Sequence, residues 1–352
     1  MYYLPKNYPS VLSKELSAVI VEPREHSALE FVINNVVKFI SREFKQNEWI
    51  LQIFYGILNE KFVKNIAIKF LNKGFNIKLI NLEVNNLTID MYNFIFTDKY
   101  FWYNCLGKYI LIFQTDSMFN LSSKYKIKDF IKYDFIGGPI EDEVGITSIV
   151  LKKNIYSKKT ITVLNGGISL RFRKAMIQAI DKNLKKNISP KIFLPIWHNI
   201  FNSLRYTGTI FNKNIWQYLY SEDVFFCQTC KKLPSLEVSR KFGIASSQNK
   251  IINFNAMTIH KPWELYASIN LKLTLGFMQK TYTTFETNKI NNFIEKTKHI
   301  KGLNTLIKLQ KTQKEIYNNN LSTKGNNNIV NIYIFLIIIF LVIYIFKKIY
   351  FF

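Results

Sequence analysis

Acidic side chains stand at three points where a short apolar run begins or ends. Glu22 closes the run LSAVIVE, Asp116 follows the run KYILIF, and Glu222 and Asp223 precede the run VFF. In an open α/β sheet, ligands bind beyond the carboxyl ends of the strands, so polar residues that follow apolar strands are candidate site residues. A buried carboxylate needs a partner, and a hard divalent cation that bridges to a diphosphate would supply one.

Each of these groups also has a purely structural explanation. Asp116 is suited to cap the helix or turn that follows it. Two acids at a helix start, Glu222 and Asp223, are what capping and the helix dipole favour. Arg24, two residues after Glu22, suits a phosphate or a base, and it equally suits an exposed loop. The residue types alone leave both explanations open.

Two later segments hold further candidate groups. Asn165, Gly166 and Gly167 precede ISLR, and two glycines allow either a close backbone approach or an ordinary tight turn. His260 and Lys261, in the segment HKPW, set an imidazole and a cation beside a large aromatic. An imidazole ligates Mn²⁺ or Zn²⁺, whereas a surface histidine next to a core tryptophan is the alternative.

The three cysteines do not indicate a disulfide framework. An odd, small number of cysteines in 352 residues fits a reducing compartment. Cys227 and Cys230 form a lone CxxC motif, late in the chain and without a second ligand pair for zinc. We therefore interpret this motif as incidental.

The first 115 residues alternate apolar runs of strand and helix type. Strands are expected at Leu16–Glu22, Trp49–Tyr55, Asn76–Ile80 and Lys108–Phe113, and helices at Leu29–Ile40, Glu60–Leu71 and most of Asp90–Cys105. The segment SALE, residues 27–30, predicts a capping box before the first helix. This βαβαβαβ order predicts an α/β fold with a Rossmann-type, mostly parallel sheet that is flanked by helices.

Shorter elements follow in the second half of the chain. The segments Phe135–Pro139 and Asn165–Leu170 are expected as short strand-and-turn pieces, and Phe172–Asn183 and Asp223–Cys230 as helices. We expect an N-terminal extension over residues 1–14, a main domain over 15–270 and a helical stalk with an Asn-rich linker over 271–328.

The net charge of +24 does not indicate a nucleic-acid partner. Only six of the 48 basic residues are arginine, the residue preferred for phosphate and base recognition, and the lysines are spread along the chain. Abundant Lys, Asn, Ile, Phe and Tyr are typical of an AT-rich genome. The charge is better explained as a solvated, lysine-rich surface, and attraction to anionic lipid headgroups would follow from it.

The segment Ile329–Phe346 predicts a transmembrane helix. It reads IVNIYIFLIIIFLVIYIF, and its 18 residues span about 27 Å as a helix, close to the thickness of a bilayer core. A short tail, 347–352, follows it. The N-terminus shows no uninterrupted apolar stretch of signal-peptide type. These features predict a C-terminal membrane anchor with the main domain on the cytosolic side, although a lumenal domain would suit the four glycosylation sequons.

Five segments occur in an order that is typical of one family. FQTDS (113–117), YDFIGGP (133–139), NGGISLR (165–171), EDVFFC (222–227) and HKPW (260–263) together resemble a family of uncharacterised glycosyltransferase-like proteins. That family is defined only as a domain of unknown function and is related to GT-A glycosyltransferases, with members in bacteria, eukaryotes and giant viruses. The resemblance covers about residues 17–263.

The resemblance implies a GT-A-like fold and a role for each candidate residue. Glu22 and Arg24 would border the nucleotide pocket, and Asp116 would stand where such enzymes carry the last acid of a DxD motif. Asn165, Gly166 and Gly167 would line the donor or acceptor sugar, His260 would be a second metal or diphosphate ligand, and Arg171 or Lys261 would neutralise the leaving group. Asp223 or Glu222 would be the general base, with Asp223 preferred. Gln114 departs from the pattern, because it replaces the first acid of DxD and so weakens the case for a tight metal site.

Three hypotheses follow from the sequence. The first is a membrane-tethered glycosyltransferase that uses a nucleotide-sugar donor, a glycan, protein or lipid acceptor, and Mn²⁺ or Mg²⁺. The second is a non-catalytic, tail-anchored scaffold that keeps the fold, which the replacement at Gln114 favours. The third is a basic nucleic-acid-associated protein. The sugar, the acceptor, the stereochemistry of transfer and the oligomeric state stay open.

Overall fold

The computed structural model describes residues 2–6, 12–140, 163–184, 222–245, 253–262, 295 and 297–316. The chain divides into two compact units, Met1–Leu306 and Ile307–Phe352, and the described residues of the second unit, 307–316, are helical. Within the described ranges, no helix has both the length and the apolar character needed to cross a bilayer. The predicted transmembrane helix, 329–346, lies outside the described residues.

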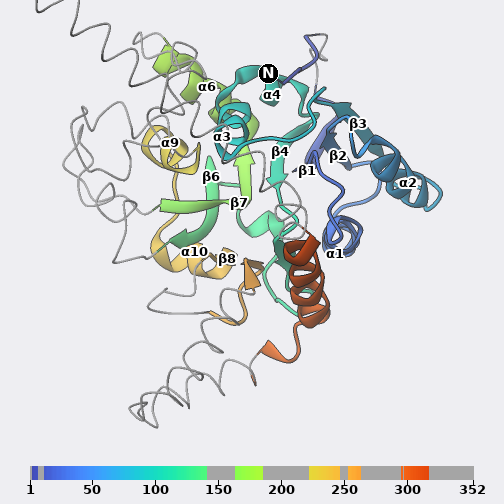
Figure 1. The fold of residues 1–352 in the computed structure, drawn as a ribbon. Helices are drawn as coiled ribbons and strands as arrows, with labels where there is room; N and C mark the ends of the chain where they lie inside the picture. The colour runs from blue at the N-terminus through green and yellow to red at the C-terminus, as the bar shows by residue number, and fades with distance from the viewer. Residues whose placement is uncertain are drawn as a thin grey trace, which may run out of the picture. The chain divides into compact units, whose positions relative to one another are not determined.

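A six-stranded mixed sheet forms the centre of the first unit (Figure 1). In spatial order its strands are β3 (Ile77–Asn81), β2 (Trp49–Tyr55), β1 (Lys14–Val21), β4 (Gly107–Ile112), β7 (Val163–Phe172) and β6 (Phe135–Ile140). The first four strands of this order pair in parallel, whereas β7 runs antiparallel to both β4 and β6. The α/β fold and the parallel first half are confirmed, while the sheet as a whole is mixed.

Helices flank this sheet. They are α1 (Leu29–Ile40), α2 (Glu60–Leu71), α3 (Ile89–Thr97), α4 (Lys99–Asn104), α6 (Arg173–Leu184), α9 (Glu222–Thr229) and α10 (Leu236–Phe242). Figure 1 shows α3, α4 and α6 grouped together, apart from α1 and α2. The expected helices at 29–40 and 60–71 have the predicted bounds, because their apolar residues keep one helical face.

One local prediction is wrong. The SALE segment forms no capping box: Ala28 is the N-cap residue of α1 and no side chain caps it. The His26 side chain instead accepts a hydrogen bond from the Ala28 amide through Nδ1, at 3.1 Å. The mostly helical stretch over 90–105 is confirmed, and it is divided into α3 and α4 because Asp98 leaves helical geometry and its carboxylate accepts a hydrogen bond from the Tyr100 amide.

The strands of the sheet are buried on both faces. In β1, Val19 and Val21 belong to the core shared with α3, α4, α6 and α9, and the alternate residues Ala18 and Ile20 are buried on the opposite face. This is why the run LSAVIVE lacks the polar alternation of a half-exposed strand. A central strand so enclosed presents only its end to solvent.

A second sheet of three short strands, β5 (Ser117–Phe119), β9 (Thr258–His260) and β8 (Gly243–Ile244), was not expected from the sequence. Strand β9 pairs antiparallel with β5, so that Ser117 lies opposite His260. The Lys261 amide extends the ladder by donating to the Asp116 carbonyl at 2.8 Å. This pairing joins two motifs that are more than 140 residues apart in the chain.

Strand β7 bulges beyond the carboxyl end of β4. Ser169 pairs with Gly137 and Leu164 pairs with Pro139, so β7 advances five residues where β6 advances two. Gly137 permits this, because a side-chain carbon there would lie 2.1 Å from the Asn165 carbonyl oxygen. Bulges commonly re-aim residues next to functional sites. Here the bulge carries the NGG segment.

Candidate functional site

The end of β1 is closed by an ion pair. Arg24 donates to both carboxylate oxygens of Glu22, at 2.7 and 2.8 Å, and the Thr115 hydroxyl approaches the same carboxylate at 3.4 Å. The buried Asn59 amide holds this loop by donating to the carbonyls of Glu22 and Arg24. Glu22 is buried while half of the Arg24 side chain is exposed. The predicted pair at the nucleotide pocket is therefore present as a pair, with the guanidinium on the solvent side.

Asp116 and His260 meet where β5 pairs with β9. The Asp116 Oδ2 atom lies 3.5 Å from the His260 Nε2 atom. Burial acts to raise the pKa of Asp116, but the nearby His260 and Lys261 charges outweigh it and hold that pKa below its usual value. Asp116 Oδ1 and His260 Nε2 are both buried and have no hydrogen-bond partner among the described residues. Lys261 adopts a left-handed backbone conformation, with φ of 45°.

The hydrogen bonds of Asn165 decide the protonation of His260. The Asn165 Oδ1 atom accepts from the Ile168 amide at 3.1 Å, which turns the Asn165 Nδ2 donor toward His260 Nδ1 at 3.2 Å. Nδ1 must then be the acceptor, so a neutral His260 carries its proton on Nε2. That Nε2 atom is a donor and has no lone pair for a metal. Of its two predicted roles, His260 fits the diphosphate ligand.

The two glycines of the bulge are closely approached, which is the first of the two explanations that the sequence left open. A side-chain carbon on Gly167 would lie 2.3 Å from Gln114 Oε1 and 2.6 Å from His260 Nε2. One on Gly166 would lie 2.1 Å from Glu222 Oε1. Gly167 therefore lies against Gln114 and His260, and Gly166 lies against Glu222. The two glycines connect the Asp116–His260 pair to the start of α9.

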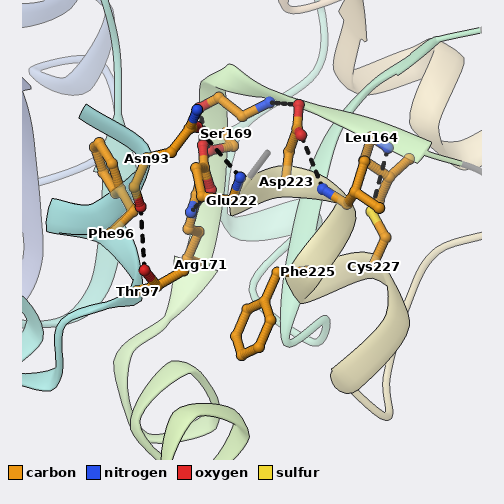
Figure 2. A network of polar contacts seen from close by, with 12 residues as sticks. Asn93, Phe96, Thr97, Leu164, Ser169, Arg171, Glu222, Asp223, Phe225 and Cys227 are labelled. Atoms are coloured by element: carbon orange, nitrogen blue, oxygen red, sulfur yellow. Dashed lines mark hydrogen bonds and ion pairs between the residues drawn. The ribbon is translucent and has the colours of Figure 1, made fainter. Parts of the chain in front are cut away.

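Arg171 and Glu222 form a buried ion pair (Figure 2). Arg171 donates to both carboxylate oxygens of Glu222, at 2.6 and 2.9 Å, and also to the carbonyl of Gly166 at 3.1 Å. Its Nε donates to Ser169 Oγ at 2.9 Å. Four aromatic rings surround the guanidinium within 6 Å: Phe96, Trp102, Phe135 and Phe226. Arg171 is fully buried, so this geometry gives it no exposed face for a leaving group, and Glu222 is occupied as its partner.

Asp223, next along α9, is placed differently. It is partly exposed, and its carboxylate accepts hydrogen bonds from the amides of Val224, at 2.8 Å, and Gly166, at 3.3 Å. Burial of the carboxyl group and the nearby Glu222 charge raise the pKa of Asp223 to about 7. Figure 2 shows Asp223 and Glu222 on opposite sides of the first turn of α9. The two adjacent acids thus have separate environments, and only Asp223 is poised to exchange a proton near neutral pH.

The structure links the sequence-predicted residues by contacts that run from the carboxyl ends of β1 and β4 to the start of α9. It adds two that sequence reasoning missed. His26 is buried, and burial lowers its pKa although Glu22 and Asp116 act to raise it. Tyr92, on α3, places a buried hydroxyl near Gln114 and Glu222. Tyr92 sits in the apolar stretch MYNFIF, where nothing in the sequence marks it as a site residue.

A divalent metal would be held by Asp116 rather than by Asp116 and His260 together. No group of three or more His, Cys, Asp or Glu side chains that could hold a metal occurs within the described ranges. Asp116 Oδ1 is an unsatisfied hard oxygen, and Mg²⁺ is commonly held by one carboxylate plus the phosphates of a substrate. Gln114 stands beside it with a neutral amide oxygen. Among the described residues, Asp116 is thus the carboxylate with an oxygen left for a metal, and a diphosphate would have to supply other ligands.

The CxxC motif is structural in this fold. Cys227 Sγ is buried and accepts a hydrogen bond from the Leu164 amide at 3.3 Å. Burial raises the pKa of both Cys227 and Cys230, so neither is activated as a thiolate. This agrees with the interpretation of the motif as incidental to chemistry.

Residues 75–260 match a family described as "Protein of unknown function (DUF5672)". The match covers more than half of the chain and includes most of the site. The chain belongs to this family. DUF5672 membership confirms the expected kind of family, a domain of unknown function, while its relation to glycosyltransferases is taken up below. A comparison with curated proteins gives no match.

The chain resembles several solved structures at low sequence identity. One is S. aureus TarS, residues 1–349, in complex with UDP-GlcNAc, with 15% identity, a TM-score of 0.31, and coverage of 48% of this chain and 47% of that one. Another is the galactosyltransferase LgtC in complex with donor and acceptor sugar analogues, with 11% identity, a TM-score of 0.41, and coverage of 78% and 99%. The chain thus spans about half of the first structure and nearly all of the second. These scores are low and carry no functional argument.

Proposed function

We propose that this chain is a glycosyltransferase that moves a sugar from a nucleotide-diphosphate donor to a hydroxyl group. The observation that carries the proposal is Asp223, a partly exposed residue at the start of α9 whose carboxylate binds the Gly166 amide and whose pKa is raised to about 7. A general base works best when its pKa lies near the working pH. The ordered motifs that resemble glycosyltransferase-like proteins support the choice of reaction.

In the proposed reaction, the acceptor hydroxyl gives its proton to the Asp223 carboxylate. The acceptor oxygen forms a bond to the anomeric carbon of the donor sugar, and the bond from that carbon to the diphosphate oxygen breaks. The electron pair leaves with the nucleoside diphosphate. Asp223 then returns its proton to solvent, which a pKa of about 7 still allows near neutral pH.

Other residues of the site stabilise the leaving diphosphate in this proposal. His260 presents a proton on Nε2 and Lys261 a cation beside it, and such donors are most effective where negative charge develops. Asp116 Oδ1 would hold a divalent cation that the diphosphate completes, and the cation would neutralise charge on the leaving group. Arg24, half exposed at the end of β1, faces the nucleotide.

Glu222 and Arg171 take a positioning role. Their buried pair fixes the first turn of α9 and the Gly166 carbonyl, so that the Asp223 carboxylate meets the Gly166 amide. The negative charge of Glu222 is also one of the two causes that raise the pKa of Asp223. Neither side chain touches the reacting atoms in this assignment.

The proposal is tested by release of UDP from UDP-glucose, UDP-galactose and UDP-N-acetylglucosamine by the full chain in detergent, with Mn²⁺. We expect turnover with at least one donor, and a fall of about 10²-fold or more in Asp223→Asn, as the loss of a general base produces. Glu237→Gln, on the exposed α10, is the matched control and should keep full turnover. Equal turnover in Asp223→Asn and the control would overturn the assignment. Binding of these donors without turnover would favour the non-catalytic scaffold.

The membrane tether is a separate part of the proposal. The apolar segment 329–346 would hold the enzyme on a membrane, with its main domain on the cytosolic side and the segment 271–328 as a spacer. The full chain should co-float with phosphatidylcholine vesicles in high salt, and a chain that ends at residue 320 should not. Flotation of both, or of neither, would contradict an anchor in this segment.

A further inference from the structure

Six buried side-chain polar atoms have no hydrogen-bond partner among the described residues, and three of them gather at the candidate site. These three are Asp116 Oδ1, His260 Nε2 and the hydroxyl oxygen of Tyr92. Leaving a buried polar atom unsatisfied is costly, so such atoms are rare in a fold and often face an absent ligand. The first two already have a role in the proposed function. Tyr92 does not.

Tyr92 is held firmly in place by its ring. It lies on α3, one turn before Phe96, and the two rings pack with centroids 4.9 Å apart. Phe96 in turn packs on the Arg171 guanidinium, whose carbon lies 5.2 Å from the centre of the Phe96 ring. The residue after Tyr92, Asn93, accepts a hydrogen bond from the Glu222 amide at 3.3 Å. Helix α3 is therefore joined to the start of α9, which carries Asp223.

The surroundings of the Tyr92 hydroxyl are those of a site for neutral, hydroxyl-bearing groups. Burial and the nearby Glu222 charge raise its pKa, and Asp116 acts in the same direction, so the hydroxyl stays protonated. The Gln114 amide is close enough to oppose this shift, although the two groups make no hydrogen bond of ordinary geometry. The Glu222 carboxylate is already paired with Arg171, and the hydroxyl itself carries no charge. A sugar hydroxyl both donates and accepts, and it suits a phenol, an amide and carboxylates equally.

The position of Gln114 links Tyr92 to the reacting centre. Gln114 Oε1 and His260 Nε2 both lie against the backbone of Gly167, and the neighbouring Gly166 amide binds Asp223. The Tyr92 hydroxyl thus lies near Gln114, which adjoins the groups assigned to the diphosphate, and near Glu222, which precedes the group assigned to the acceptor proton. In a glycosyltransferase, the transferred sugar lies between the diphosphate and the acceptor hydroxyl.

We propose that the Tyr92 hydroxyl, together with the Gln114 amide, binds a hydroxyl of the transferred sugar and contributes to the choice of donor sugar. This inference rests on the proposed function. It adds Tyr92 to the site and defines a subsite for one hydroxyl of the sugar. A contact there would distinguish a nucleotide sugar from the free nucleotide diphosphate. Tyr92 is a binding residue here and takes no proton from the acceptor.

The test compares Tyr92→Phe with wild type in calorimetric titrations with UDP and with UDP-glucose, UDP-galactose and UDP-N-acetylglucosamine. Loss of one hydrogen bond should weaken the preferred nucleotide sugar by about fivefold to tenfold and leave UDP affinity unchanged. Tyr109→Phe, a hydroxyl removed from β4, is the matched control and should change neither affinity. Equal weakening of UDP and nucleotide sugar in Tyr92→Phe, or no weakening of either, would overturn the inference.

Stability provides a second and independent measurement. A tyrosine whose hydroxyl supported the fold would lower the melting temperature when replaced by phenylalanine. A hydroxyl that binds a ligand has no hydrogen-bond partner in the free protein. Tyr92→Phe should therefore melt at the same temperature as wild type or higher. A clear fall in melting temperature would assign Tyr92 to the fold and end the proposal.

The outcomes also separate this inference from the proposed function. If wild type binds UDP and a nucleotide sugar but Tyr92→Phe does not discriminate between them, the subsite fails and the transferase proposal stands. If wild type binds neither, both proposals fail.

Discussion

Two acid–base pairs lie at the same edge of the sheet and differ in how fully the protein satisfies them. Arg171 and Glu222 are buried, joined by two hydrogen bonds and enclosed by aromatic rings. Asp116 and His260 are also largely buried, but their closest approach is 3.5 Å and each leaves an atom without a partner. The first pair is complete within the fold. The second pair is complete only when a ligand supplies the missing partners. The difference therefore distinguishes a pair that stabilises the fold from a pair that binds a ligand.

The largest expected effect comes from breaking the complete pair. Arg171→Met leaves the Glu222 carboxylate buried without its partner, and such a change typically costs about 3–5 kcal/mol of unfolding free energy. Urea denaturation measures it. The double variant Arg171→Met with Glu222→Leu is the control, since removing both charges should recover much of the loss. A single variant as stable as wild type would show that the pair does not hold the fold together.

The second prediction concerns the pH dependence that Asp223 imposes. Its folded pKa, about 7, is raised above the usual value of 3.8, so between these values the folded state binds more protons than the unfolded state. Unfolding free energy should therefore fall as pH rises from about 4 to 7, while turnover should rise through pH 7 as the base ionises.

Asp223→Asn should remove both trends together. Chemical denaturation and initial rates across this pH range measure them in parallel, with Glu237→Gln as the variant that keeps both. A rate profile in Asp223→Asn that still rises through pH 7 would assign the base elsewhere.

The third prediction tests whether the incomplete pair needs the substrate for metal binding. Because Asp116 is, among the described residues, the carboxylate with an oxygen left for a metal, Mn²⁺ alone should barely change the melting temperature, whereas Mn²⁺ with UDP should raise it more than UDP alone. At 100 times the dissociation constant, ligand binding adds about 2.7 kcal/mol of stability.

Asp116→Asn should lose this metal-dependent increment, and in the free state it should lose less stability than Arg171→Met does. That contrast sharpens the distinction between the two pairs. An increment of the same size with Mn²⁺ alone would indicate a metal site built by the protein itself.

The smallest effects are expected from replacing two neighbouring glycines. Gly166 lies beside the Arg171–Glu222 pair, and Gly167 lies beside His260 of the Asp116–His260 pair. A methyl group on Gly166 meets the Glu222 carboxylate and Arg171, which cannot move, and overpacking of this kind costs about 1–3 kcal/mol. A methyl group on Gly167 meets the ends of Gln114 and His260. Gly167→Ala should therefore lose less stability than Gly166→Ala but more UDP affinity. Denaturation and calorimetry of both variants check this order, and the reverse order would contradict the comparison.

Much of the fold could be predicted because each strand and helix of the first half carries its own pattern. The helices at 29–40 and 60–71 and the strand at 49–55 have the predicted bounds, since one apolar face or one continuous apolar run defines each. The small sheet could not be predicted. Strands β5 and β9 have only three residues each, too few for a period, and they form because distant segments pair.

The candidate site was predicted as a set of residues, and the roles within the set depended on contacts. Glu222 and Asp223 are chemically alike and adjacent, and only the position of Arg171 shows which carboxylate is occupied. His260 looked like a metal ligand until the hydrogen bonds of Asn165 assigned its proton. Tyr92 went unnoticed, because a tyrosine in an apolar helix is ordinarily a core residue.

By itself the sequence determined the α/β order of elements, the apolar strands and the polar groups that follow them, because these depend on local periodicity and composition. Tertiary structure alone decided which polar groups are satisfied by the fold and which are left for a ligand. The reason is that hydrogen bonding and burial depend on neighbours from β5, β7, α3 and α9, which the chain brings together across long separations.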